Sequence, residues 1–213
     1  MTSRLILLRH AETQANAAQV WQGSMDAPFS PNGQAQVDAT AHYFPEFVRK
    51  FPVDHAYVSP TGRAQRTAAP LAQVLGTPAI VHDPLREFDL GDWEGRSFED
   101  LRKNEDLWAR WDRDPTFAPP NGESPASFQR RAVQALNALL DTHPGQTVLA
   151  VTHGGIIAYA LSEFLGDGGP DWDRWEPPNC AITVLDRDES GWHEIMVNSV
   201  EHLGELVSVP LIG

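Results

Sequence analysis

The sequence predicts an α/β fold, specifically a three-layer α/β/α sandwich with a mostly parallel central sheet. The first observation is that short apolar runs alternate with longer amphipathic segments along the chain. A parallel sheet covered by helices on both faces leaves this pattern in a sequence. The second is size, because 213 residues with 41% hydrophobic composition can bury the core of a single domain spanning residues 1–213. No internal repeat or low-complexity linker divides the chain.

Six apolar runs have the length of strands. In chain order they cover residues 5–8, 55–59, 79–81, 147–152, 181–186 and 194–198. The amphipathic segments between them fit helices, which completes the alternation expected of this fold class.

Two of the helices begin with the same pair of residues. Residues 30–44 start with Ser30 as a candidate N-cap and Pro31 at the first helical position, and residues 123–143 repeat the device at Ser124. A serine hydroxyl can accept a hydrogen bond from a backbone N–H at a helix start. Proline is tolerated at the first helical position because the N–H that it lacks would have no partner within the helix. Both helix starts are therefore well defined by the sequence.

Two further segments are less regular. Residues 66–76 fit a helix that Pro70 should kink or interrupt and that ends at Gly76. Residues 104–122 combine tryptophans, charged residues and an exit rich in proline and glycine. We expect them to form an excursion from the sheet.

The charge and cysteine content argue against several classes of protein. A net charge of -13 and a pI near 4.9 disfavour nucleic-acid and anionic-membrane binders, because a positive field holds such partners. Cys180 is the single cysteine, so no intramolecular disulfide framework forms. The apolar stretches fall short of the ~20 residues that span a bilayer, and no signal-peptide pattern is present. We expect a cytoplasmic protein, and a homodimer is compatible with the sequence, which does not determine the oligomeric state.

Polar side chains follow three of the predicted strands where each strand ends. Arg9 and His10 follow the first strand, Ser59 and then Arg63 follow the second, and His153 follows the fourth. Ligands bind beyond the carboxyl ends of the strands in an open parallel sheet. If the first and fourth strands are parallel neighbours, the histidines and arginines face one crevice.

Such a crevice suits a dianionic phosphate group. Guanidinium groups form charge-assisted, often bidentate hydrogen bonds to phosphate oxygens. Backbone amides of a helix that starts at Gly154, directly after His153, can add further hydrogen bonds. Taken singly, a histidine at a strand end is more often a structural residue, and an arginine such as Arg63 more often faces solvent. The conjunction at three strand ends is what favours a phosphate site.

An acidic segment follows the third strand. Glu87 comes after a short loop, and a carboxylic acid beside a phosphate pocket is a natural proton donor for a departing alkoxide. Asp89, Asp92 and Glu94 lie close behind and compete for the same role. Residue chemistry alone does not rank these four acids.

These segments resemble the histidine phosphatase superfamily, which includes cofactor-dependent phosphoglycerate mutases, fructose-2,6-bisphosphatases and many broad phosphatases. "LLRHAETQAN" is similar to the family's Arg-His-Gly-Glu-Thr block, with Asn16 at the family's asparagine. "QGSMDAPFSPNGQAQ", "SPTGRAQRTA", "EFDLGDWEG" and "VTHGG" match further blocks in the same order. One departure is Ala11, which stands where the family usually has glycine and either narrows the pocket or marks a subgroup that tolerates alanine.

The resemblance implies a phosphoglycerate mutase-like fold and a set of site residues. Its catalytic positions match Arg9, His10, Arg63, Glu87 and His153. Its pocket-lining positions match Asn16, Gln22 and Gly23.

The mechanism suggested by the resemblance needs neither a metal ion nor another cofactor. Neutral His10 would attack phosphorus through one ring nitrogen while the other donates a hydrogen bond that fixes the tautomer. Arg9, Arg63 and His153 would hold the equatorial oxygens of the phosphoryl group. Glu87 would protonate the leaving oxygen and then activate the water that hydrolyses the phosphohistidine.

The sequence favours a phosphatase of small-molecule phosphate monoesters over a mutase. A mutase must hold a second acidic group of its substrate, for which the mutases carry adjacent arginines near a tryptophan. Here Arg110 and Arg113 are separated and Asp112 lies between them. A noncatalytic phosphoester-binding relative is a further alternative. A metal hydrolase is disfavoured because the eight histidines form no close-spaced ligand cluster.

The same segment is the candidate specificity lid. Trp108, Trp111 and Phe117 could stack on an apolar or aromatic leaving group. The alternative is that these rings only pack the excursion against the core. The identity of the substrate does not follow from the sequence.

Overall fold

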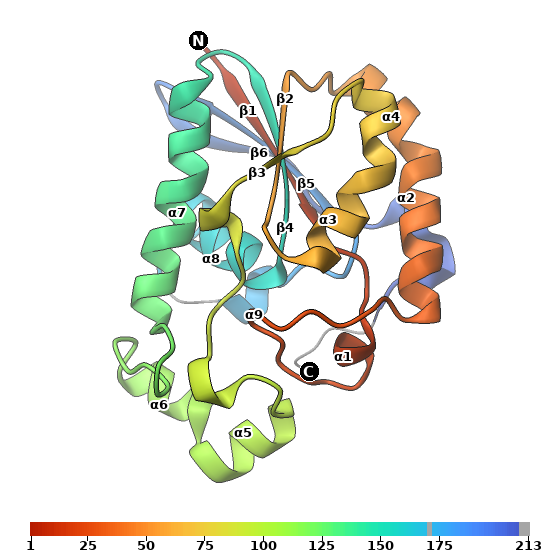
Figure 1. The fold of residues 1–213 in the computed structure, drawn as a ribbon. Helices are drawn as coiled ribbons and strands as arrows, with labels where there is room; N and C mark the ends of the chain where they lie inside the picture. Colours follow the sequence, from red (N-terminus) through yellow and green to blue (C-terminus); the bar gives the residue numbers. More distant parts are fainter. Residues whose placement is uncertain (170–171, 209–213) are drawn as a thin grey trace.

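The computed structural model describes residues 1–169 and 172–208, and its centre is a six-stranded sheet with the order β3-β2-β4-β1-β5-β6 (Figure 1). The strands are β1 (Ser3–Arg9), β2 (His55–Val58), β3 (Ile80–Val81), β4 (Thr147–Thr152), β5 (Ile182–Asp188) and β6 (Gly191–Ser199). The first four strands are parallel to one another, whereas β5 runs antiparallel to β1 and β6 antiparallel to β5. The predicted fold class and the parallel pairing of the first and fourth strands are confirmed.

All six predicted strands are present. The prediction for 147–152 coincides with β4, and the other strand ends differ from the predicted ones by at most three residues. The largest shift is at β6, which begins at Gly191 because a tight hairpin pairs this residue with Asp188 of β5. None of the residues of β6 is fully buried and its exposed residues, 193–195, are consecutive, so its sequence lacks the apolar alternation that would have marked its start.

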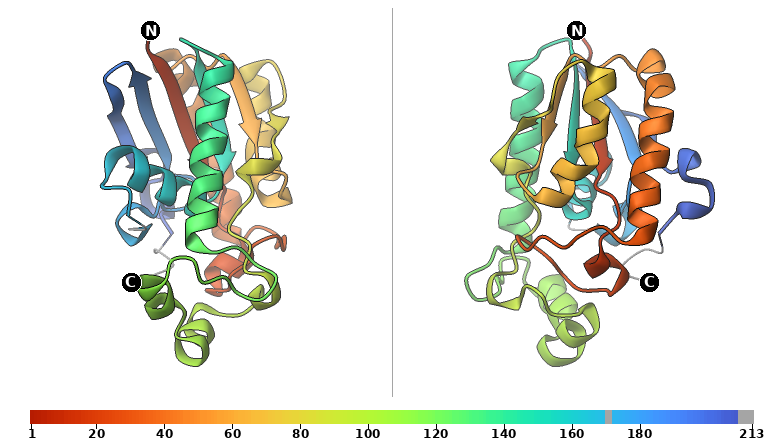
Figure 2. Two further views of the ribbon diagram at one scale, coloured as in Figure 1. Left: turned by 90° about the vertical axis from the view of Figure 1, so that its left-hand side faces the viewer. Right: turned by 45° about the vertical axis from the view of Figure 1, so that its right-hand side comes forward.

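Helices cover the sheet on both faces (Figures 1 and 2). One face carries α7 (Pro125–Thr142) and α8 (Gly154–Leu165), and the other carries α2 (Pro31–Lys50), α3 (Gly62–Ala68) and α4 (Ala72–Leu75). The shorter elements are α1 (Gln14–Ala17), η1 (Ala69–Leu71), η2 (Asp83–Leu85), η3 (Gly91–Trp93), α5 (Phe98–Glu105), α6 (Leu107–Arg113), α9 (Trp172–Trp175) and η4 (Glu201–Leu206). Within the described ranges, no helix combines the length and apolar character needed to cross a membrane.

The helix starts follow the sequence prediction, and one helix end does not. The side chain of Ser30 accepts a hydrogen bond from the Gly33 amide, and that of Ser124 accepts one from the Ser127 amide. α2 continues to Lys50 rather than ending at residue 44, although Pro45 removes one of its backbone donors. Burial of Phe44 and of Phe47 on the next turn offsets that loss. Pro70 interrupts its helix as expected, because η1 separates α3 from α4.

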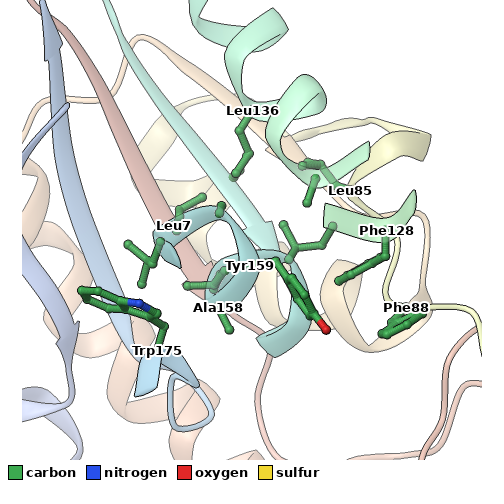
Figure 3. Close-up of a cluster of buried hydrophobic side chains, with 14 of the residues drawn as sticks. Leu7, Leu85, Phe88, Phe128, Leu136, Ala158, Tyr159 and Trp175 are labelled. Atoms are coloured by element: carbon green, nitrogen blue, oxygen red, sulfur yellow. The ribbon is translucent and has the colours of Figure 1, made fainter. Parts of the chain in front are cut away.

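Alternate residues of β1 and β4 point to opposite faces and so define two cores. Leu5 and Leu7 pack with α7 and α8, whereas Ile6 and Leu8 pack with α2 and α3. Figure 3 shows the first core, in which Phe88, Phe128 and Tyr159 lie together next to the strand ends. This double burial explains why the central strands read as continuous apolar runs.

The excursion leaves the sheet at the carboxyl ends of the parallel strands. α5 and α6 lie beyond that edge, apart from the layers of the sandwich (Figure 1). The excursion begins earlier than residue 104, because α5 already starts at Phe98. Its position places it over the edge at which the sequence predicted a ligand site.

Candidate active site

The strand order brings the predicted residues of three strand ends together. β1 pairs with β4 with Arg9 opposite Thr152, and the His10 amide donates to the Thr152 carbonyl oxygen at 2.9 Å. His153 follows Thr152 directly, so its ring lies against that of His10 with the ring centroids 5.1 Å apart. β2 lies on the other side of β4 and delivers Arg63 through the first turn of α3.

His10 is held in one tautomer. Its ring is buried, and Nδ1 lies 2.8 Å from the carbonyl oxygen of Ala11, which can only accept, so Nδ1 carries the proton. Nε2 is then the unprotonated nitrogen, and its lone pair accepts a long hydrogen bond from Arg63 Nε at 3.3 Å. Burial lowers the pKa of His10 well below its ordinary value, and the charges of Arg63 and Arg9 lower it further. His10 is therefore a neutral imidazole with one nitrogen available for attack.

Arg63 is fixed by the loop that follows α1. Its Nη2 donates to the Gly23 carbonyl oxygen at 2.8 Å and its Nη1 to the Met25 carbonyl oxygen at 2.6 Å. Gly23 has a φ of +52°, and a Cβ there would lie 1.7 Å from Glu94 Oε1. The positive φ thus favours glycine in the turn that presents this carbonyl group to the guanidinium.

Arg9 lies on the other side of His10 and contacts residues that precede β5. Its Nη1 donates to the Pro177 carbonyl oxygen and lies 3.4 Å from Glu176 Oε1. Gly154, at the start of α8, approaches the guanidinium so closely that a Cβ there would lie 3.1 Å from Arg9 Cζ. Arg9 Nε is buried and has no hydrogen-bond partner among the described residues.

His153 packs behind His10 rather than on the pocket surface. Its Nε2 shares a hydrogen bond of 2.7 Å with Ser59 Oγ, while Nδ1 has no partner in the described part of the chain. Burial lowers the pKa of His153 well below its ordinary value, with Arg63 adding to the effect. The ring is fully buried and neutral.

Glu87 is the one of the four candidate acids that lines the pocket. It lines the pocket, where its Oε2 accepts from the Gly155 amide at 3.3 Å and its Oε1 from the Phe88 amide at 2.9 Å. The other three acids stabilise the loop instead: Asp89 accepts from the Gly91 amide, Asp92 from Asn121 and Glu94 from Ser24. None of these three lines the pocket that contains His10.

Arg131 of α7 anchors the loop that carries Glu87. Its guanidinium donates to the carbonyl oxygens of Pro84 at 2.9 Å, Arg86 at 2.8 Å and Glu87 at 3.2 Å. Glu123 pairs with the same guanidinium through two hydrogen bonds of 2.8 and 2.6 Å. The backbone of the Glu87 loop is therefore tied to a rigid helix.

The pocket is a cavity of about 550 Å³, a volume that includes the space at its open mouth. Its lining includes the charged and polar side chains of Arg9, His10, Arg63, Glu87 and Glu176 together with several aromatic rings. We call the five rings that line it the aromatic wall: Trp21, Phe88, Phe98, Trp111 and Tyr159. They pack against one another, with Trp21 and Phe98 centroids 5.1 Å apart and Phe88 and Trp111 stacked at 5.1 Å.

The predicted pocket-lining residues Asn16, Gln22, Gly23 and Gly154 all lie at this cavity. Asn16 Oδ1 accepts from Thr13, and Gln22 Nε2 donates to the Thr13 hydroxyl at 2.8 Å. Of the predicted lid residues, Trp111 lines the cavity. Trp108 and Phe117 do not line it: Trp108 packs against Trp111, and Phe117 packs against Trp93. The sequence analysis missed Trp21, Phe88, Phe98, Tyr159, Gly155 and Glu176.

Ala11 does not narrow the pocket. It is fully buried in a small apolar cluster with Val37, Cys180 and Leu203, and it is not among the residues that line the cavity. Its backbone does not adopt a positive φ, so alanine causes no strain there. Among residues 1–169 and 172–208, no group of three or more histidine, cysteine or acidic side chains is placed to hold a metal ion.

Comparison with known proteins identifies the family. The family model of the histidine phosphatase superfamily (branch 1) matches residues 5–200. The "Probable phosphoglycerate mutase GpmB" of Cronobacter sakazakii is 35% identical over 191 residues, which cover 89% of this chain and 87% of that protein. The structure of YhfR from Bacillus stearothermophilus is 30% identical with a TM-score of 0.79, covering 94% of this chain and 99% of that one. A mycobacterial glucosyl-3-phosphoglycerate phosphatase is 27% identical with a TM-score of 0.78, covering 94% and 100%. The chain therefore belongs to the histidine phosphatase superfamily.

Proposed function

We propose that this protein is a metal-independent phosphatase that hydrolyses phosphate monoesters of small molecules through a phosphohistidine on His10. The observation that carries the proposal is the state of His10: Nδ1 donates to Ala11, and the lone pair of Nε2 lies beside two arginines. A neutral imidazole with a fixed tautomer is a competent nucleophile. A cationic surround stabilises the phosphoryl group that it attacks.

The phosphoryl group would take its hydrogen bonds from Arg9 and Arg63, which line the cavity beside His10, whereas His153 lies buried behind His10 and does not line the cavity. Arg9 Nε is a buried donor that no described residue satisfies, and such a group costs about 1–3 kcal/mol. A phosphate oxygen would remove that cost. Attack by His10 Nε2 forms the N–P bond as the P–O bond to the alcohol breaks.

Glu87 acts as the general acid and then as the general base. The departing oxygen takes a proton from the Glu87 carboxyl group, and the same carboxylate then accepts a proton from the water that attacks phosphohistidine. Its place at the cavity, 3.3 Å from the Gly155 amide, supports this role over Asp89, Asp92 and Glu94. The second step releases inorganic phosphate and returns His10 to its neutral form.

The cavity favours a phosphatase over a mutase. Arg110 and Arg113 do not line it: Arg110 lies over the Phe117 ring and Arg113 pairs with Asp106. The aromatic wall suits an apolar or aromatic alcohol. A mutase-type activity remains the alternative because of the name carried by the Cronobacter sakazakii relative.

A panel of phosphate esters assayed with EDTA tests the proposal. The panel contains 4-nitrophenyl phosphate, a nucleoside monophosphate, a sugar bisphosphate, 3-phosphoglycerate and a phosphopeptide. We expect release of inorganic phosphate from small monoesters at a rate that EDTA does not change. Complete loss of activity with EDTA, or conversion of 3-phosphoglycerate to its isomer without release of phosphate, would contradict it.

A further inference from the structure

The pocket contains a second buried carboxylate, Glu176, that the proposed mechanism does not use. It lies in the segment between α9 and β5, and it lines the same cavity as His10 and Glu87. Its side chain is 5% exposed and its Oε1 lies 3.4 Å from Arg9 Nη1, whose own side chain is 4% exposed. The Glu176 carboxylate is thus a buried partner of the Arg9 guanidinium.

Apart from Arg9 and Arg63, the described lining of the cavity contains no lysine or arginine. The lining residues include two cations, Arg9 and Arg63, and two carboxylates, Glu87 and Glu176. Both cations are proposed to hold the phosphoryl group, and we call this pair the phosphate clamp. The nearby Arg174 is exposed and lies over the ring of Trp175, outside this lining. The residues outside the described ranges, 170–171 and 209–213, include no lysine or arginine.

Among the described lining residues, a substrate with a second anionic group would therefore meet no cation other than Arg9 and Arg63. A phosphoglycerate brings a carboxylate two or three bonds from its phosphate ester, and Glu176 would lie close to it because it contacts Arg9. Like charges in a site of low dielectric repel strongly. A hydroxyl group in the same place could instead donate a hydrogen bond to the Glu176 carboxylate.

We propose that Glu176 is a specificity-determining residue that excludes phosphate esters carrying a carboxylate next to the phosphate. The substrate class is then the monoester of an uncharged, hydroxyl-bearing alcohol whose body fits the aromatic wall. This inference rests on the proposed function, because it takes Arg9 and Arg63 as the phosphate clamp. The role proposed for Glu176 is to select which ester binds, and the residues proposed to perform the reaction stay the same.

Glycerol 3-phosphate and 3-phosphoglycerate form a matched pair for the test, because one carries a hydroxymethyl group where the other carries a carboxylate. Their dissociation constants are measured by calorimetry in the His10→Ala background, which cannot turn them over. Glu176→Gln and Glu176→Ala are compared with Glu163→Gln, which removes an exposed carboxylate of α8 outside the cavity. The ratio of the two constants cancels any loss of phosphate affinity caused by disturbing Arg9.

With Glu176 present, we expect glycerol 3-phosphate to bind at least tenfold more tightly than 3-phosphoglycerate. Glu176→Gln should reduce that preference about tenfold or more, and Glu163→Gln should leave it unchanged. Equal effects of Glu176→Gln and Glu163→Gln on the ratio would overturn the proposal. Tighter binding of 3-phosphoglycerate with Glu176 present would also overturn it, whatever the fate of the variants.

The proposed function is tested apart from this inference by turnover of 4-nitrophenyl phosphate by the wild-type chain. Absence of that turnover would contradict the phosphatase proposal and leave the binding ratio to decide the role of Glu176. Normal turnover with an unchanged ratio would contradict the role of Glu176 alone.

Discussion

The polar lining of the cavity and the aromatic wall are built on different principles. Arg9, His10 and Arg63, which we call the floor, and His153, which packs behind His10, all lie at or just after the carboxyl ends of adjacent parallel strands. Hydrogen bonds to backbone carbonyl groups fix His10 and both arginines. The rings of the aromatic wall come from separate segments between residues 21 and 159 and are held mainly by contact with one another. The floor is suited to chemistry on phosphorus, and the wall is suited to selecting the alcohol.

Removal of the proposed nucleophile, His10, should lower the catalytic rate more than any other change. A small effect would contradict the distinction between floor and wall. We expect His10→Ala to lower kcat on 4-nitrophenyl phosphate by at least about 10⁴-fold, as loss of a covalent nucleophile does. His193→Ala, an exposed histidine on β6, should be close to wild type. Retention of a tenth or more of the wild-type kcat in His10→Ala would show that the floor is not the reaction centre.

Glu87→Gln should have an effect that depends on the leaving group. Loss of a general acid slows a reaction by about 10²–10⁴-fold when the leaving group needs a proton. We expect a loss in that range on glycerol 3-phosphate and less than about tenfold on 4-nitrophenyl phosphate, whose leaving group needs little help. Asp92→Asn should affect both substrates equally and weakly. Equal large losses on both substrates in Glu87→Gln would argue for a binding role.

Protonation of histidines in the folded core, and not the aromatic wall, should determine how the stability of the protein changes with pH. Burial lowers the pKa of His10 and His153 well below the ordinary value and that of His202 to about 4. Below about pH 6.5 the unfolded chain then binds more protons than the folded chain, so the free energy of unfolding falls as the pH falls.

The slope is at most about 1.4 kcal/mol per pH unit for each histidine. Urea unfolding at pH 7.5, 6.0 and 5.0 measures it, and His202→Gln should reduce it. Stability that rises on acidification through this range would show that these rings are charged in the folded protein.

A change in the wall should have the smallest effect and should be selective. Trp111 is 6% exposed, and its indole nitrogen donates to the Phe117 carbonyl oxygen at 3.2 Å. We expect Trp111→Leu to raise KM for aryl phosphates about fivefold, since a stacking partner is lost, and to leave KM for glycerol 3-phosphate within about twofold. Steady-state kinetics with both substrates, and a thermal melt to establish folding, test this. Equal rises in KM would mean that the wall only supports the fold.

The floor could be predicted from the sequence because strand ends in a parallel sheet meet at one edge. Arg9, His10 and His153 each directly follow an apolar run, so the sheet topology alone places them together. The wall could not be predicted in the same way. Its rings look like core residues in the sequence, and only the packed fold separates Trp111, which lines the cavity, from Trp108, which does not.

Glu176 escaped prediction for a topological reason. Because β5 runs antiparallel to β1, its amino end lies at the same edge as the carboxyl ends of the parallel strands. The residues that precede β5 therefore reach the site, whereas the sequence analysis inspected only residues that follow strands. The choice among Glu87, Asp89, Asp92 and Glu94 likewise needed the hydrogen bonds of the folded loop.

Trapping of the phosphorylated intermediate tests the central claim most directly. The wild-type chain is mixed rapidly with ³²P-labelled phosphate monoester and denatured in base, and the label is located by peptide mapping. We predict label on the peptide that contains His10, stable in base, lost in acid and absent from the His10→Ala variant. Label on another residue, or turnover without any base-stable label on His10 under conditions that trap it, would contradict the account.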